Sequence, residues 1–147
     1  KKYPIISLED PFAEDDWSSF SAFKKVLPAG VQLVGDDLYV TNLQRLEQGL
    51  EQEATTAILI KPNQVGTLTE TIEVILKAKE HNLACMMSHR SGETNDSFIV
   101  DLAVAMAVGQ LKAGAPCRGE RLAKYNRLLK IDNQINGQSQ YGSWPIK

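Results

Sequence analysis

Ala-Ile-Leu-Ile-Lys-Pro-Asn-Gln-Val-Gly, residues 57–66, is the most informative stretch of this sequence. Its four leading apolar residues predict a short buried strand that ends on Lys61, and Pro62 and Gly66 then take the chain out of the strand. A low-dielectric environment disfavours the charged form of an amine, so a lysine at such a strand end is a candidate proton acceptor. The alternative is a strand that ends where its first charged side chain reaches water.

An apolar run followed by a helical pattern occurs five times along the chain. The runs begin near residues 5, 31, 56, 83 and 110, an interval of about 26 residues each time. Strands that alternate with helices at a steady interval are typical of βα units in a parallel sheet. We therefore predict an α/β fold, with helices over about 15–27, 42–50, 67–80, 97–108 and 119–135.

Length and composition narrow the class of protein. The 147 residues predict one domain over 1–135, followed by a loosely ordered tail over 136–147 that is rich in Gly, Ser and Gln. The formal charge of −2 argues against a general nucleic-acid binder, and no apolar run is long enough to span a membrane. Cys85 and Cys117 have no CxxC spacing, which indicates free thiols in a reducing cytoplasm. Because the chain starts on Lys1 and enters a strand almost at once, we expect it to be part of a longer protein.

Polar side chains follow the apolar runs at the point where each predicted strand ends. The carboxyl ends of parallel strands lie on one rim of a sheet, so these side chains are expected to share one mouth. Carboxylates there suit Mg²⁺, and an arginine suits a phosphate group. The alternative for each carboxylate is an ordinary turn or helix cap. The residues are Glu9, Asp36, Lys61, His89 with Arg90, and Lys112.

Several long motifs in the chain are similar to those of the enolase (phosphopyruvate hydratase) family. They read SLEDPFAEDDW at 7–17, GDDL at 35–38, LIKPNQVGTL at 59–68, SHRSGET at 88–94, KAGAP at 112–116 and ERLAKYN at 120–126. The resemblance extends from about Tyr3 to Ile135. It implies a partial TIM-type (β/α) barrel made of the last five βα units of the enolase C-terminal domain.

The resemblance also implies a metal-dependent reaction. Its substrate is 2-phosphoglycerate, which is dehydrated reversibly to phosphoenolpyruvate in glycolysis and gluconeogenesis with Mg²⁺ as cofactor. Glu9 and Asp36 correspond to two of three carboxylates that bind one Mg²⁺, and Ser91 lies near a second Mg²⁺. Glu9 is also expected to contact the substrate.

The remaining roles implied by the resemblance concern the substrate itself. Lys61 corresponds to the base that takes the C2 proton, and Lys112 to the lysine that contacts the substrate carboxylate. Arg90 and Ser91 correspond to phosphate-side binders, with His89 beside them.

Other consequences of the resemblance concern the chain as a whole. Enolases have a further N-terminal domain and three more barrel strands, so we expect the isolated chain to be inactive. We expect the full-length protein to form a homodimer or larger homo-oligomer in the cytoplasm. The alternatives are a form at the cell surface or secreted that binds plasminogen through the C-terminal Lys147, and a non-catalytic assembly fragment.

Overall fold

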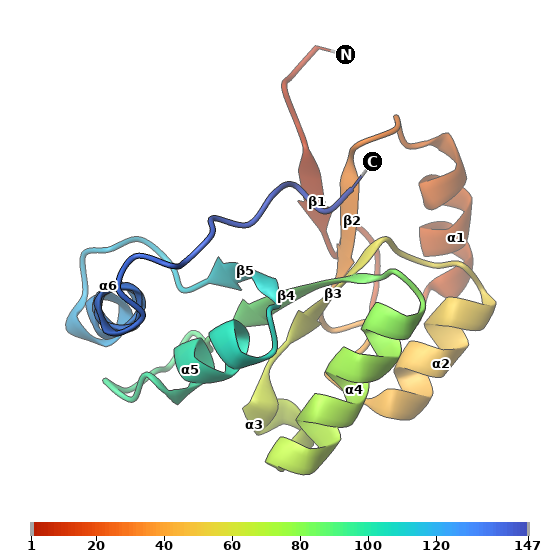
Figure 1. Cartoon of the computed structure of the whole chain (residues 1–147). Helices are drawn as coiled ribbons and strands as arrows, with labels where there is room; N and C mark the ends of the chain where they lie inside the picture. The colour runs from red at the N-terminus through yellow and green to blue at the C-terminus, as the bar shows by residue number, and fades with distance from the viewer. Residues whose placement is uncertain (1, 147) are drawn as a thin grey trace.

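The computed structural model describes residues 2–146 and shows one parallel sheet (Figure 1). Its strands lie in chain order, so each βα unit places its strand beside the previous one. This topology confirms the predicted α/β fold. The strands are β1 (Ser7–Glu9), β2 (Gln32–Gly35), β3 (Ala57–Ile60), β4 (Ala84–Ser88) and β5 (Gly109–Lys112).

Helices cover the outer face of this sheet. Several begin at the side-chain caps that the sequence indicates: Asn42 accepts from the Arg45 N–H, and Thr67 accepts from the Glu70 N–H. The helices are α1 (Trp17–Val26), α2 (Leu43–Glu51), α3 (Pro62–Val65), α4 (Leu68–Glu80), α5 (Phe98–Ala105) and α6 (Gly119–Gln134). Among the described residues, no helix has the length and apolarity needed to cross a membrane.

Side chains along each strand point alternately to the two faces of the sheet, and this divides the apolar residues into two clusters. On β3, Ile58 and Ile60 belong to the large cluster that also contains helix residues such as Phe20, whereas Ala57 and Leu59 belong to a smaller cluster. Successive strand side chains point to opposite faces, so the smaller cluster marks the inner face of the curved sheet. It contains Val34, Ala57 and Leu59, with Ala84 and Met86 packed against them.

The structure differs from the predicted helices in two details. The chain leaves the strand at Pro62, as predicted, but it does so through a short helix, α3, that the sequence does not indicate. Pro62 occupies the first turn of α3, where the missing N–H of proline is not needed. The predicted helix over 97–108 ends at Ala105, and Phe98 and Val104 are 45% and 42% exposed. Its nearly uniform apolar composition therefore overstated how much of it the fold buries.

The C-terminal segment crosses the end of the sheet where the strands begin (Figure 1). Within residues 136–146 there is no helix or strand beyond the turn that ends α6. Trp144 Nε1 nevertheless donates to the Gly30 carbonyl oxygen at 2.9 Å, just before β2. Lys147, the residue on which the plasminogen-binding alternative depends, lies outside the described residues.

Gly49 on α2 leaves room for the buried ring of Tyr39, which lies in the loop that follows β2. Tyr39 is 1% exposed, its hydroxyl lies 2.7 Å from Thr55 Oγ1, and burial raises the pKa of Tyr39 to about 12. A Cβ added at Gly49 would overlap the Tyr39 ring. Only a residue without a side chain therefore fits between α2 and this ring.

We expect Gly49→Ala to lower the free energy of unfolding by about 2 kcal/mol, because overpacking a rigid core outweighs the gain in helix propensity. Urea unfolding of the purified chain measures the change. Gln48→Ala, on the exposed side of the same helix, is the control and should be neutral or slightly stabilising. A Gly49→Ala protein more stable than the wild type would contradict this account of the packing.

Candidate active site

The predicted polar residues lie at the carboxyl ends of the strands. Glu9 and Lys112 are the last residues of β1 and β5, and Asp36 and Lys61 directly follow β2 and β3. Lys61 lies two residues beyond Leu59 of β3, so its side chain is on the same, inner side of the sheet as Leu59. The structure thereby brings two acids and two bases to the same end of the inner face.

Asp36 and Lys61 form a close ion pair. Lys61 Nζ donates to Asp36 Oδ1 at 2.7 Å and to Oδ2 at 2.6 Å, and the two side chains are only 12% and 10% exposed. The Lys61 backbone N–H donates to Thr41 Oγ1 at 2.8 Å, and Thr41 is fully buried. Both the backbone and the amine of Lys61 are therefore held by the loop that follows β2.

Glu9 and Lys112 form a second pair that joins the two edges of the sheet. Lys112 Nζ donates to Glu9 Oε1 at 2.5 Å, although the residues are 103 positions apart in sequence. β1 and β5 are the outermost strands, so the sheet must curl to bring their carboxyl ends within side-chain reach. The five strands thus form a half-barrel with both ion pairs at its mouth.

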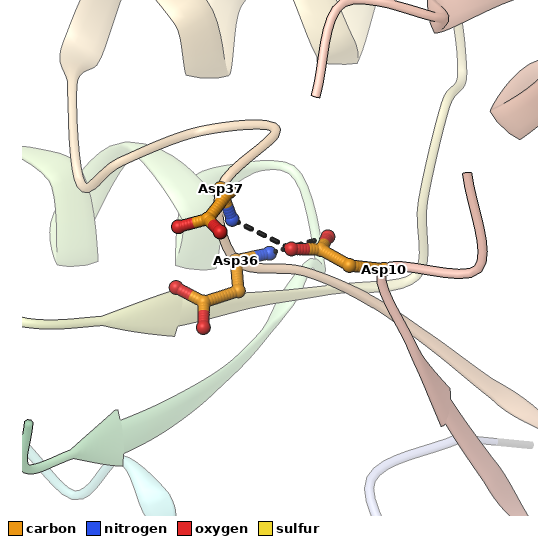
Figure 2. A group of neighbouring side chains, drawn as sticks. All are labelled: Asp10, Asp36 and Asp37. Atoms are coloured by element: carbon orange, nitrogen blue, oxygen red, sulfur yellow. Dashed lines mark hydrogen bonds between the residues drawn. The ribbon is translucent and has the colours of Figure 1, made fainter. Parts of the chain in front are cut away.

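A third carboxylate, that of Asp10, binds the backbone at the start of the loop that follows β2 (Figure 2). Asp10 accepts hydrogen bonds from the backbone N–H groups of Asp36, at 2.9 Å, and of Asp37, at 2.7 Å. Burial raises the pKa of Asp10, and the two N–H bonds oppose that rise. The Asp36 carboxylate points away from Asp10 (Figure 2), so Asp10 fixes the backbone that presents Asp36.

His89, Arg90 and Ser91 begin the loop that follows β4. His89 is tied to β5, because its Nδ1 lies 2.9 Å from the Lys112 carbonyl oxygen. Arg90 and Ser91 are exposed, and within residues 2–146 their side chains form no hydrogen bond or ion pair. The structure places this loop at the mouth end of the sheet but does not bring Arg90 or Ser91 into contact with the two ion pairs.

A lysine on α6 anchors that same loop. Lys124 is 1% exposed, and its Nζ donates to the Thr94 carbonyl oxygen at 2.6 Å and lies 3.6 Å from Glu93 Oε1. Basic residues recur every three positions on this helix, a pattern that indicates a solvated or salt-bridged face: Arg118, Arg121, Lys124, Arg127 and Lys130. The ion pairs of Arg127 with Asp101 and of Lys124 with Glu93 agree with a salt-bridged face, but the pattern does not indicate that Lys124 is buried.

The donor set of the mouth fits a divalent cation. Mg²⁺ is typically held by one or two carboxylates together with water and substrate oxygens. Glu9 and Asp36 both face cations already, since an ammonium nitrogen lies 2.5–2.7 Å from their oxygens and stands in for a positive ion. Asp10 and Asp37 also have carboxylate oxygens within 4.8 Å of Asp36, but Asp10 uses both of its oxygens on backbone N–H groups.

Comparison with known proteins identifies the family. A model described as "Enolase, C-terminal TIM barrel domain" matches residues 1–145. The chain is 55% identical over 146 residues to the enolase of Elusimicrobium minutum (strain Pei191), covering 99% of this chain and 34% of that protein. It is 54% identical over 136 residues to the enolase of Helicobacter pylori (strain Shi470), covering 92% and 32%.

These matches confirm the resemblance and the TIM-barrel type of fold predicted from the sequence. The chain spans about a third of the length of the curated relatives it matches. Its parallel half-barrel agrees with the TIM barrel that the matched description names. The chain therefore belongs to the enolase family, as part of its C-terminal TIM barrel domain.

Proposed function

We propose that this chain carries the proton-accepting lysine and two metal-binding carboxylates of a Mg²⁺-dependent hydro-lyase. The reaction is the reversible dehydration of 2-phosphoglycerate to phosphoenolpyruvate. One observation carries the proposal: two carboxylate–ammonium pairs, Asp36–Lys61 and Glu9–Lys112, lie at one mouth of the half-barrel. An anionic substrate with a carboxylate and a phosphate needs positive charge, which the two ammonium groups, and Mg²⁺ bound by the two carboxylates, would supply at this mouth.

Lys61 is the proposed base. Its amine is held in place by Asp36 and its backbone by Thr41, so it does not need to become ordered before it reacts. The ammonium that pairs with Asp36 must first release a proton to solvent, and the neutral amine then accepts the C2 proton of the substrate. Removal of that proton leaves negative charge on the substrate carboxylate. Lys112 is proposed to contact this carboxylate from the edge strand β5, where its positive charge stabilises the added negative charge.

Glu9 and Asp36 are the proposed ligands of Mg²⁺, with Ser91 near a second ion. When bound, the metal supplies Lewis-acid neutralisation of the developing negative charge. Arg90 and Ser91 are proposed to bind the phosphate, and His89 to line the pocket beside them. The exposure of Arg90 and Ser91 supports this role, because it leaves their donors free for a ligand.

The direct test is a chimera, hereafter the enolase chimera. It consists of the part of the Elusimicrobium minutum enolase that precedes the matched region, followed by residues 1–147 of this chain. We expect it to form phosphoenolpyruvate from 2-phosphoglycerate, because the matched region is 55% identical and the chimera keeps Glu9, Asp36, Lys61 and Lys112 of this chain. A folded chimera without turnover would contradict the proposed function.

Removal of metal should abolish turnover by the enolase chimera. With excess EDTA we expect activity to fall to background and to return when MgCl₂ is added in excess over the chelator. Asp36→Asn should raise the Mg²⁺ concentration needed for half-maximal activity about tenfold or more, because it removes a charged oxygen ligand. Asp132→Asn, a half-buried carboxylate near the C-terminal end of α6, is the control for loss of one carboxylate. Unchanged activity in EDTA would rule out the metal role.

A second candidate role is a non-catalytic assembly partner. β1 and β5 each have one unpaired edge among the described residues, and an open edge favours pairing with another segment. Size-exclusion chromatography of this chain, with and without the N-terminal part of the relative, would detect such an assembly. A homodimeric full-length protein, a cytoplasmic location and plasminogen binding through Lys147 are further proposals.

A further inference from the structure

The contact between α6 and the loop after β4 has no role in the proposed chemistry so far. Lys124 lies in the middle of α6 and is almost completely buried, which is costly for an ammonium unless it is paired. Its contacts are Glu93 and the Thr94 carbonyl oxygen, both in the loop. We call this group the Lys124–Glu93 brace.

Glu93 extends the brace toward the exposed residues of the loop. Its Oε1 accepts from the Thr94 N–H at 2.9 Å, and its Oε2 accepts from the Arg90 N–H at 3.4 Å. One carboxylate therefore closes a short turn around Ser91 and Gly92, and Lys124 fixes that carboxylate to a long helix. Arg90 and Ser91 are exposed, yet the backbone on which they sit is anchored to the interior.

We propose that Lys124 is a positioning residue that acts through Glu93 to hold Arg90 and Ser91 in place for the substrate phosphate. The proposal rests on the function proposed above for these two side chains. An exposed loop without such an anchor would lose conformational freedom when it binds, and that loss would weaken binding. The Lys124–Glu93 brace orders the loop before the substrate binds, although most residues from 90 to 96 are exposed.

The brace itself can be tested on the isolated chain by limited proteolysis. Trypsin cleaves after exposed arginines, and cleavage after Arg90 reports how often the loop opens. We expect Lys124→Met to speed this cleavage about fivefold or more, as followed by mass spectrometry. Lys130→Met, on the exposed side of α6, is the matched control and also removes one lysine. An unchanged rate of cleavage after Arg90 would overturn the brace.

The positioning role is tested in the enolase chimera. Lost order at the phosphate weakens ground-state and transition-state binding alike, so we expect Lys124→Met to raise KM about tenfold with kcat within about threefold. Glu93→Gln should act in the same direction. In an Arg90→Met background, Lys124→Met should change KM much less, because residues that act as one unit are not additive.

The two readouts separate the possible failures. Faster cleavage after Arg90 together with an unchanged KM would overturn the positioning role. A loss of kcat alone would overturn it as well, because a merely structural defect in the mouth would have that effect. If the wild-type chimera is inactive, the proposed function fails, and the proteolysis of the isolated chain still decides whether the brace exists.

Discussion

Lys61→Met in the enolase chimera is expected to lower kcat about 10³-fold while KM stays within a few-fold. A positioned general base contributes about 10²–10⁴ to a rate, and a methionine at this place cannot accept a proton. The other proposed substrate contacts, Lys112 and Arg90, remain, so the substrate should still bind. Stopped-flow and steady-state measurement of phosphoenolpyruvate formation gives both constants.

Two further variants make this result specific. Lys61→Met leaves the partly buried Asp36 without its partner, so thermal unfolding must show that the protein still folds. Lys61→Arg keeps the positive charge beside Asp36 but cannot act as a base near neutral pH, and it should be as inactive as Lys61→Met. Lys130→Met is the surface control; a Lys61→Met protein with wild-type kcat would exclude Lys61 as the base.

The sequence predicted the fold well because the relevant signals are local. Each apolar run is short and each is followed by a helical pattern, which is enough to predict βα units and a parallel sheet. The same reasoning placed Glu9, Asp36, Lys61 and Lys112 at one rim, because strand ends of a parallel sheet share a side. The structure shows two pairs among these four side chains.

The supporting contacts could not be predicted, because they join residues that are far apart in sequence. Asp10 looks like an ordinary Asp-Pro turn residue until its carboxylate is seen on the N–H groups that follow β2. Lys124 looks like one of several basic residues on α6 until its burial against Glu93 is seen. In each case the spatial partner is set by the curvature of the sheet and the packing of a helix.

The isolated chain of 147 residues is expected to show no turnover of 2-phosphoglycerate, at least about 10⁴-fold below the enolase chimera in kcat/KM. A TIM barrel needs eight strands and residues 2–146 form five, so the mouth stays open on one side. Glu9 and Lys112 are already 33% and 41% exposed, and water between charges weakens the electrostatic stabilisation of a transition state. The resemblance also implies three carboxylates around one Mg²⁺, of which Glu9 and Asp36 are only two.

The measurement is a coupled assay on the purified chain, with circular dichroism to show that it is folded. Adding the N-terminal part of the relative as a separate polypeptide should restore part of the activity if the open edges β1 and β5 can pair with it. The same addition to the Lys61→Met chain should restore none, because the base is absent whatever completes the barrel. Turnover by the isolated chain near that of the chimera would mean that five strands suffice to hold both ion pairs in working geometry.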